Sequence, residues 1–213
     1  MGTLDDASNR TVQMNRIYQA LGRFVVEFSR VVLAMETGVQ FVINGDQQLV
    51  STLTVEMTAD PLARAWRSAM TQAIDLSDED NEVLAGLANE VRTLTNLRND
   101  WAHGTWFVGY GNEETTDWSK AGLMRFKNSA KGVGRSTKLE SEPTAEYIDR
   151  AATHASLVAD AVNTFGLIVT MRRLGSLGEN THPSDRVRIV KEGGRRHIKV
   201  TQDGSNWRSS EWT

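Results

Sequence analysis

The sequence contains no cysteine among its 213 residues. Disulfide bonds, thiolate metal sites and cysteine nucleophiles are therefore excluded for this chain. The sequence also lacks a run of about 18 consecutive apolar residues, which a membrane-spanning helix requires, so no membrane span is expected. Residues 1–6 are polar and acidic, unlike the apolar core of a signal peptide. These absences together predict a cytoplasmic protein.

Motifs of several common enzyme classes are also missing. No glycine-rich phosphate loop is followed by Lys and Ser or Thr, and no serine elbow is present. The histidines lack the spacing of metal ligands; they are His103, His154, His182 and His197. We therefore expect a function that needs neither a metal nor a cofactor.

The chain has little excess charge of either sign. It carries 24 Lys and Arg against 27 Asp and Glu, for a formal net charge of −3. A nearly neutral protein does not attract nucleic acid over its whole surface, so any RNA contact must be local. Hydrophobic content of 39% and charged content of 24% are those of a soluble globular protein. The length suits one substantial domain with an appendage.

Hydrophobic residues recur at three- and four-residue steps over long stretches, which predicts a mainly helical fold. Asp60, before Pro61, is expected to cap one helix, and Ser77 to cap the next. The short segment 46–60 is ambiguous, since its alternation suits a strand and its threonines suit a loop with one helical turn. The predicted helices cover residues 8–44, 61–74, 77–103 and 143–175.

Two other segments have the composition of β-strands. Residues 105–110 are aromatic and β-branched, with partner strands expected at 123–127 and 136–139. After a linker at 175–185, a Gly-Gly turn divides a second, basic hairpin. We therefore predict a helical domain over residues 8–175 with a β-rich insertion at 104–142, followed by a linker, basic hairpin and tail at 176–213. The tail's tryptophans, Trp207 and Trp212, are expected either to fray or to dock.

Groups able to bind phosphate and move protons are concentrated at the end of the third predicted helix. Asn99 and His103 lie four residues apart and so share a helix face. Arg98 lies about 140° around the axis from His103, and its long stem can bring the guanidinium to the same side. An imidazole exchanges protons near neutral pH, and a guanidinium binds phosphate in a bidentate fork. Gly104 suits the left-handed position just past a helix end.

The same residues also have an ordinary structural interpretation. A histidine in the last turn can simply complement the helix dipole, and a nearby arginine can bond the last carbonyls. Three observations favour the functional interpretation instead: Asn99 follows Arg98, the motif ends a long predicted helix, and the rest of the chain is mainly helical.

The motif Arg98-Asn99-x-x-x-His103 resembles the Arg-x(4–6)-His motif of the HEPN superfamily, the higher eukaryotes and prokaryotes nucleotide-binding domains. The resemblance extends over roughly residues 10–175 and implies an HEPN-like helical bundle with the motif ending an inner helix. Many HEPN proteins are metal-independent endoribonucleases whose site forms where two copies meet. The resemblance therefore implies a homodimer that cleaves RNA, with catalytic residues Arg98, Asn99 and His103.

The family also suggests a biological setting. HEPN proteins often act in toxin–antitoxin pairs or antiphage defence, so an antitoxin or a defence protein is an expected partner. Toxins paired with nucleotidyltransferase antitoxins often carry Tyr two residues after the histidine. This chain has Thr105 there, which counts against regulation by tyrosine modification.

Supporting residues are expected on two other segments. In HEPN proteins a polar residue on an early helix often faces the Arg–His pair, and Glu27 or Glu36 could have that role. Both can equally be solvent-facing helix charges. Between residues 122 and 139 the chain has five cations and no acid, which predicts a local RNA-binding surface. The predicted RNA-binding residues are Arg125, Lys127, Lys131 and Arg135; alternatively, the segment is a solvated hairpin.

A second function of another class stays open. Some HEPN proteins have lost catalysis, and Asp100 places a negative charge beside the motif. The chain would then be a non-catalytic helical dimer that binds a nucleotide, RNA or a protein partner. In an enzyme, Arg98 and His103 of both protomers should face one solvent-open cleft. In a scaffold, Arg98 should be buried against a carboxylate and His103 occluded.

Overall fold

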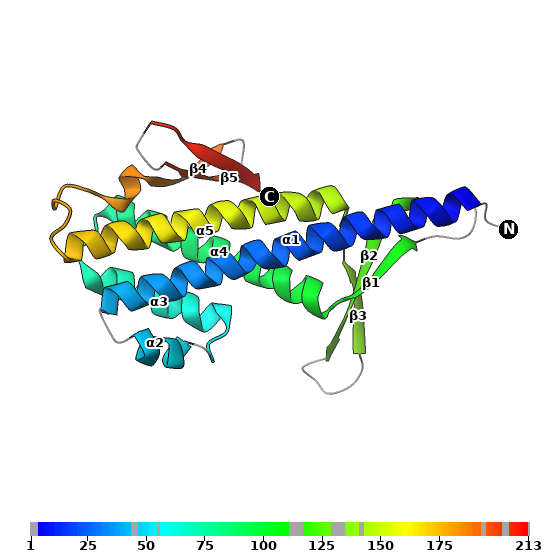
Figure 1. Cartoon of the computed structure of the whole chain (residues 1–213), viewed down its shortest axis with the longest axis horizontal. Helices are drawn as coiled ribbons and strands as arrows, with labels where there is room; N and C mark the ends of the chain where they lie inside the picture. Colours follow the sequence, from blue (N-terminus) through cyan, green and yellow to red (C-terminus); the bar gives the residue numbers. More distant parts are fainter. Residues whose placement is uncertain are drawn as a thin grey trace. The chain divides into compact units, whose positions relative to one another are not determined.

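A computed structural model describes residues 4–43, 47–54, 56–110, 117–128, 135–140, 143–192, 195–201 and 205–212 (Figure 1). Its helices are α1 (Leu4–Ile43), α2 (Gln47–Thr54), α3 (Ala59–Ala73), α4 (Asp78–His103) and α5 (Ala145–Arg173). The strands are β1 (Thr105–Tyr110), β2 (Asp117–Asn128), β3 (Arg135–Glu140), β4 (Val187–Glu192), β5 (Arg195–Val200) and β6 (Arg208–Trp212), with a 3₁₀ turn, η1, at Pro183–Asp185. The predicted mainly helical fold with two β regions is confirmed.

Two of the long helices begin at side-chain caps. Ser77 Oγ accepts a hydrogen bond from the Asp80 N–H at 3.1 Å, and Asp80 Oδ2 accepts one from the Ser77 N–H at 3.2 Å. This reciprocal pair satisfies N–H groups that the first turn of α4 leaves open, so the predicted Ser77 cap is confirmed. At α5, Thr144 Oγ1 accepts the Tyr147 N–H at 3.1 Å, directly after Pro143.

The start of α3 differs from the prediction. Thr58 occupies the capping position, with extended backbone, and Asp60 already lies in the first helical turn. The prediction that Asp60 caps this helix is therefore wrong. Its carboxylate instead lies where the positive end of the helix dipole favours an acid.

The ambiguous segment after α1 forms a helix rather than a strand. Within α2 the Thr54 hydroxyl donates to the Val50 carbonyl at 3.0 Å, and both residues are buried. Leu49 and Leu53, one turn apart, are each 60% exposed. The steps of four residues that separate both pairs are those of a helix.

The chain forms two compact units, and α1, α4 and α5 contribute residues to both. Unit 1 consists of Met1–Val25 and Asn96–Ala152, and unit 2 consists of Val26–Thr95 and Thr153–Thr213. The predicted domain boundary at residues 175–176 stays a prediction. Unit 1 holds β1–β3, and unit 2 holds α2, α3 and the C-terminal strands.

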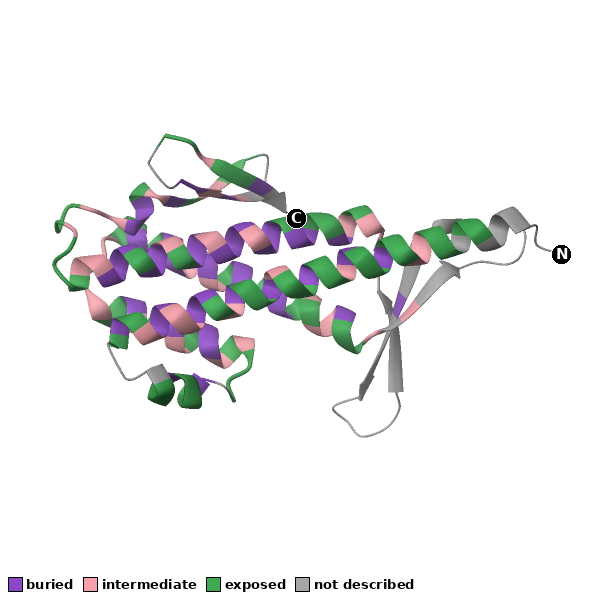
Figure 2. Ribbon diagram, in the orientation of Figure 1, coloured by how far each residue is buried: buried purple, intermediate pink, exposed green. Residues whose placement is uncertain are grey.

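The core of unit 2 is built around a tryptophan between helices. Trp66 of α3 is fully buried and makes an edge contact with Phe165 of α5, at 6.0 Å between ring centroids. Buried positions recur along both helices (Figure 2). A Cβ atom at Gly38 of α1 would lie 2.9 Å from Trp66 Nε1. The absence of a side chain at residue 38 therefore allows α1 to approach the indole closely.

The C-terminal strands of unit 2 form an antiparallel sheet in the order β4-β5-β6. Val187, Ile198 and Val200 are buried on its inner face. Ile189 reaches α4 at Gly86, where an added Cβ would lie 2.3 Å from its Cδ1 atom. The predicted hairpin therefore gains a third strand, β6, and is packed on the helices.

The segment predicted as a linker is held at a fixed point by Asp80. This fully buried carboxylate accepts the Ser184 N–H at 2.9 Å and bonds His182 Nδ1 at 3.0 Å. Burial alone would raise the pKa of Asp80, but hydrogen bonds from Ser184, His182 and Ser77 together lower it below its ordinary value. Asp80 thus joins the start of α4 to the chain that enters β4.

Among the described helices, only α5 has the length and hydropathy of a membrane span, and 67% of that stretch is buried within the protein. The core helix of a soluble protein has the same properties. The fold is therefore consistent with a soluble protein.

Candidate functional site

The motif lies in the last turns of α4, in unit 1, where aromatic packing fixes the helix. Trp101 is 6% exposed and makes an edge contact with Phe24 of α1, at 4.6 Å between centroids. It also contacts Tyr147 of α5 at 6.2 Å and Trp106 of β1 at 6.4 Å. Trp106 Nε1 donates to the Trp101 carbonyl at 2.8 Å, which satisfies one of the carbonyls that a helix end leaves free.

Gly104 ends α4 for a different reason than predicted. Gly175 is the only described glycine with a positive φ, at 71°, so the prediction of a left-handed Gly104 is wrong. A Cβ at residue 104 would instead lie 2.7 Å from the Asp100 carbonyl oxygen and 2.3 Å from Leu123 Cδ1. Leu123 is a buried residue of β2, so Gly104 is needed where the first sheet meets the end of α4.

The polar side chains of the motif are open to solvent. Arg98 and His103 are exposed and Asn99 is half-buried. Arg98 Nη1 donates to Asn99 Oδ1 at 3.1 Å. Arg98 has no bond to His103, and His103 has no hydrogen-bond partner within the part of the chain that the structure describes.

This arrangement has a defined chemical capacity. The free imidazole of His103 can accept or donate a proton, because neither ring nitrogen is occupied by a described group. The guanidinium of Arg98 carries five N–H donors and uses one on Asn99, so a bidentate edge remains for a phosphate. The site lacks the buried Arg98 and occluded His103 expected of a pure scaffold.

The predicted supporting carboxylates, Glu27 and Glu36, are half-buried residues of α1 in unit 2. Glu27 accepts a hydrogen bond from Arg30 at 2.7 Å. Arg30 also donates to Ser156 at 3.0 Å and to Asp160 at 3.2 Å. The hydrogen bond to Glu27 is the main cause of the raised pKa of Arg30. A role of either glutamate beside Arg98 and His103 stays a prediction.

The predicted RNA-binding side chains of the first sheet lie outside the described residues. The backbone pairs as an antiparallel meander, β1-β2-β3, with Trp106 opposite Leu123. The segment after His103 therefore forms strands, as the sequence predicts, and these strands belong to unit 1. For Arg125, Lys127 and Arg135 the structure describes the backbone but not the side chain. Lys131 lies outside the described residues altogether.

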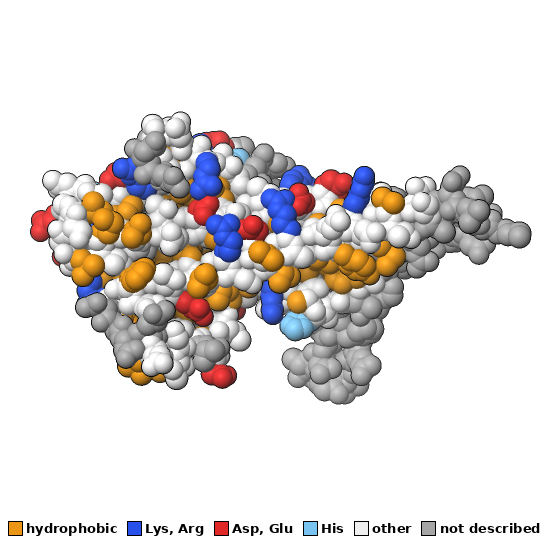
Figure 3. All heavy atoms as spheres, in the orientation of Figure 1, with side chains coloured by type: hydrophobic (Ala, Val, Ile, Leu, Met, Phe, Trp, Pro, Cys, Tyr) orange, Lys and Arg blue, Asp and Glu red, His pale blue; other side chains and the backbone are white. Residues whose placement is uncertain are grey.

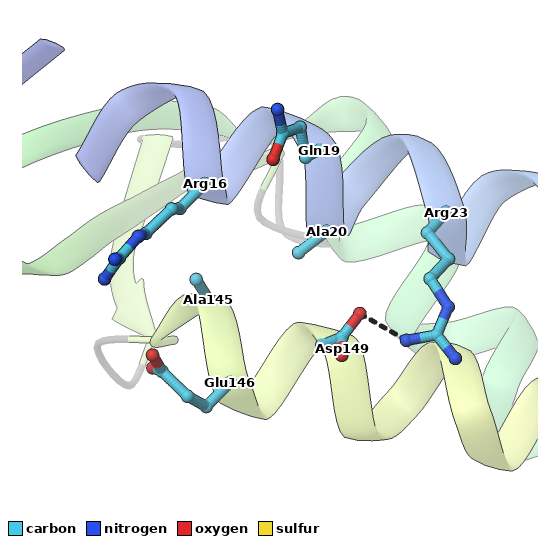
Figure 4. A pocket seen from close by; sticks show the side chains of 7 residues that line it. All are labelled: Arg16, Gln19, Ala20, Arg23, Ala145, Glu146 and Asp149. Carbon is cyan, nitrogen blue, oxygen red and sulfur yellow. Dashed lines mark hydrogen bonds and ion pairs between the residues drawn. The ribbon is translucent and has the colours of Figure 1, made fainter. Parts of the chain in front are cut away.

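An open groove in unit 1 runs between α1 and α5 (Figure 4). Arg16 and Arg23 line its α1 side, and Glu146 and Asp149 line its α5 side. Arg23 forms an ion pair with Asp149. Because cations and acids balance there, the groove has no preference for a charged ligand of one sign.

Part of the surface of α1 in unit 1 is apolar and exposed (Figure 3). Tyr18 is 54% exposed and Val25 is 49% exposed, and Gly22 between them has no atom within 4 Å of an added Cβ. Steps of four and three residues place all three on one face of the helix. Val12, 46% exposed, adds to the apolar surface of this helix.

The described residues contain no group of three His, Asp or Glu side chains that could hold a metal ion. No protein-family model matches the chain, and comparisons with curated proteins and with solved structures give no significant match. The chemistry of the site must therefore be judged from its own residues.

Sequence reasoning did not identify the aromatic support of this site. Trp101 lies within the motif and Trp106 lies three residues after it, and the indole N–H of Trp106 binds the backbone carbonyl of Trp101. The available signal was two tryptophans bracketing a predicted helix end, since a buried indole N–H usually finds a partner.

Proposed function

We propose that this protein is a metal-independent endoribonuclease of the HEPN type that acts as a homodimer. The observation that carries the proposal is the exposure of Arg98 and His103 in the last turns of one helix, with Arg98 bonded to Asn99. A proton-transfer group and a phosphate-binding group are thus both open to solvent in the last turns of α4.

The proposed reaction is cleavage through the 2′-hydroxyl of RNA. The His103 ring removes the proton of the 2′-hydroxyl, whose oxygen attacks the adjacent phosphorus. The bond to the 5′-oxygen breaks, and a second imidazole protonates that leaving oxygen. Arg98 stabilises the charge that develops on the phosphate oxygens, and Asn99 holds the guanidinium in place. The products are a 2′,3′-cyclic phosphate and a 5′-hydroxyl, and the proton-transfer groups contribute about 10²–10⁴-fold.

A homodimer supplies the second imidazole. The chain carries one motif histidine, whereas this reaction uses one base and one acid. In a two-fold dimer the same surface of each copy meets the other, so two copies of His103 can share one cleft. The exposed face of α1 formed by Tyr18, Gly22 and Val25 is an apolar surface suited to such a contact.

The resemblance to HEPN proteins suggests a cytoplasmic role for this activity, in a toxin–antitoxin pair or in antiphage defence. An antitoxin or another defence protein would then restrain or trigger the enzyme. RNA is the proposed substrate, and the reaction needs no cofactor.

The test is cleavage of a labelled RNA mixture in EDTA by wild type, His103→Ala and a control, Asn96→Ala. Asn96 is exposed on the same helix, outside the motif. We expect wild type and control to cut, the His103 variant to lose at least about 10²-fold, and the products to carry cyclic phosphate ends. Mass measurement on the same samples should give a dimer.

Undiminished cleavage by His103→Ala would show that the histidine has no catalytic role. A folded dimer that binds RNA without cutting it would favour the second function, a non-catalytic binding module. Binding and cleavage should therefore be measured on the same preparation.

A further inference from the structure

The positive charge of this acidic chain is concentrated in its last strands. Residues 186–212 carry seven Lys and Arg against three Asp and Glu, whereas the rest of the chain carries 17 against 24. The C-terminal sheet is thus locally cationic on a protein of net charge −3. Such an asymmetry points to a polyanion as the partner of the basic segment.

The sheet turns one face to the helices and the other to solvent. Side chains alternate along its strands, so Val187 of β4 is buried and Arg188 is exposed. The pairing register places Arg188 opposite Lys199 of β5, and Lys199 opposite Ser209 of β6. Ser209 is also exposed, so one row of polar residues crosses all three strands on the outer face.

At one end of this row, an arginine lies on a tryptophan. The guanidinium carbon of Arg188 is 4.9 Å from the centre of the Trp207 ring. Arg188 is exposed and forms no ion pair among the described residues, while Trp207 is half-buried. The ring therefore holds the guanidinium in position without neutralising it, which lowers the entropy that a bound ligand would cost.

The neighbouring cations differ in whether an acidic side chain neutralises them. Lys199 Nζ lies 2.6 Å from Glu192 Oε1, and this hydrogen bond lowers the pKa of Glu192. Glu192 therefore stays ionised and neutralises Lys199. Lys191 is exposed at the end of β4, but it alternates in step with the buried Val187, so its side chain belongs to the opposite face from Arg188. The register also places Arg196 opposite Lys191 and Arg195 opposite Glu192.

We propose that the outer face of the β4-β5-β6 sheet binds single-stranded RNA. Arg188 contacts a phosphate, and a base stacks on the Arg188–Trp207 pair. Unpaired bases stack well on aromatic rings and guanidinium planes, and this contact tolerates any sequence. The proposal rests on the proposed nuclease function, for which the sheet would be a substrate-holding surface outside the catalytic motif.

The composition of this face favours RNA over an apolar partner. None of the described residues of β4, β5 and β6 is a large exposed hydrophobic, in contrast to α1 and α2. A protein groove or a membrane would need such side chains as anchors. Cations beside an aromatic ring instead match the charge and the π-faces of a single strand.

The test uses a fluorescent oligouridylate in EDTA and the His103→Ala protein as background, so that the RNA stays intact. Adding Arg188→Ala should weaken binding about tenfold, the effect of losing one stacked base. Adding Lys191→Ala, on the opposite face of the sheet, should leave both the affinity and the slope of log affinity against log salt unchanged. The matched control is Arg92→Ala, an exposed arginine on α4, which should leave affinity and slope unchanged.

A gain of affinity separates the proposal from damage to the fold. Glu192→Gln releases Lys199 from its ion pair, so we expect tighter binding and a steeper salt slope, by about 0.7. Equal effects of Arg188→Ala and Arg92→Ala would overturn the proposal, as would stronger binding to duplex RNA or to acidic vesicles than to the single strand. Because binding is measured without cleavage, it can stand if the nuclease activity fails, and the reverse also holds.

Discussion

His154 Nε2 of α5 lies 3.2 Å from Glu90 Oε2 of α4, with both side chains inside unit 2. The histidine side chain is 1% exposed and the glutamate side chain 8%. The other ring nitrogen, Nδ1, lies 2.8 Å from Ser210 Oγ of β6. One imidazole therefore ties two helices and the last strand together, and its partners satisfy both of its nitrogens.

Removing the carboxylate should be the most costly change in this group. In Glu90→Ala a buried ring nitrogen loses its partner, so we expect the free energy of unfolding to fall by about 2–3 kcal/mol. Ser210→Ala should cost about 1 kcal/mol, the usual value of one hydrogen bond. Urea unfolding followed by fluorescence checks both values. As the control, Glu82→Ala at an exposed α4 position should stay within about 0.5 kcal/mol of wild type.

Asp80 predicts a dependence of stability on acid. Its pKa is lowered in the folded protein, so its contribution is complete above the unfolded carboxyl pKa, about 3.9, and disappears as pH falls through the lower folded value. Asp80→Asn should lower the free energy of unfolding by about 1.5–3 kcal/mol at neutral pH. The difference from wild type should shrink below about pH 4. A constant difference from pH 7 to pH 2 would contradict this assignment.

Gly104→Ala should disturb the junction between α4 and β1. Its Cβ would lie 2.7 Å from the Asp100 carbonyl oxygen, so the backbone must shift, at a cost of about 1–3 kcal/mol. Thermal unfolding measures this loss, and cleavage assays would report displacement of His103. Gly178 has no atom within 4 Å of an added Cβ, so Gly178→Ala should be neutral. Equal melting temperatures for the two variants would mean that the junction relaxes freely.

Under the proposed function, Arg98→Lys should be nearly as damaging as Arg98→Ala. Lysine keeps the charge but lacks the planar fork that binds two phosphate oxygens. We expect about 10²-fold slower single-turnover cleavage in EDTA, similar to the loss of one oxyanion donor. Arg92→Lys, an exposed position on the same helix, should cleave at the wild-type rate. Full activity of Arg98→Lys would show that only the positive charge at residue 98 matters, and not the two-pronged guanidinium.

The long helices could be predicted because each buries a continuous stripe of large side chains. In α1 the stripe includes Ile17, Phe24 and Val31, at seven-residue steps, all nearly inaccessible. Helix ends were harder, because several polar residues near Thr58 can each act as a cap. The corresponding stripe of α4 indicates that Glu90 is buried, since Glu90 lies three residues after Leu87 and four before Leu94.

Strand β6 could not be predicted from its residues. Arg208–Trp212 has no apolar alternation, and it pairs because β5 offers a free edge and Ser210 meets a buried histidine. At the candidate site, the sequence placed Arg98 and His103 correctly at the end of a helix. It could not reveal that residue 104 must be glycine because Leu123, 19 positions later in the chain, packs against it. Such requirements come from contacts between distant segments, which local patterns do not contain.

The order of residues in the two units has a consequence for protein synthesis. Unit 1 ends at Ala152, so all of its residues exist while the rest of the chain is still being translated. Unit 2 begins at Val26, yet its interior includes Ser210, which bonds His154. The buried pair of Glu90 and His154 therefore cannot bond Ser210 until that residue has left the ribosome. Unit 1 can complete its packing before residues 153–213 are made, whereas unit 2 completes its packing only after Ser210 has been made.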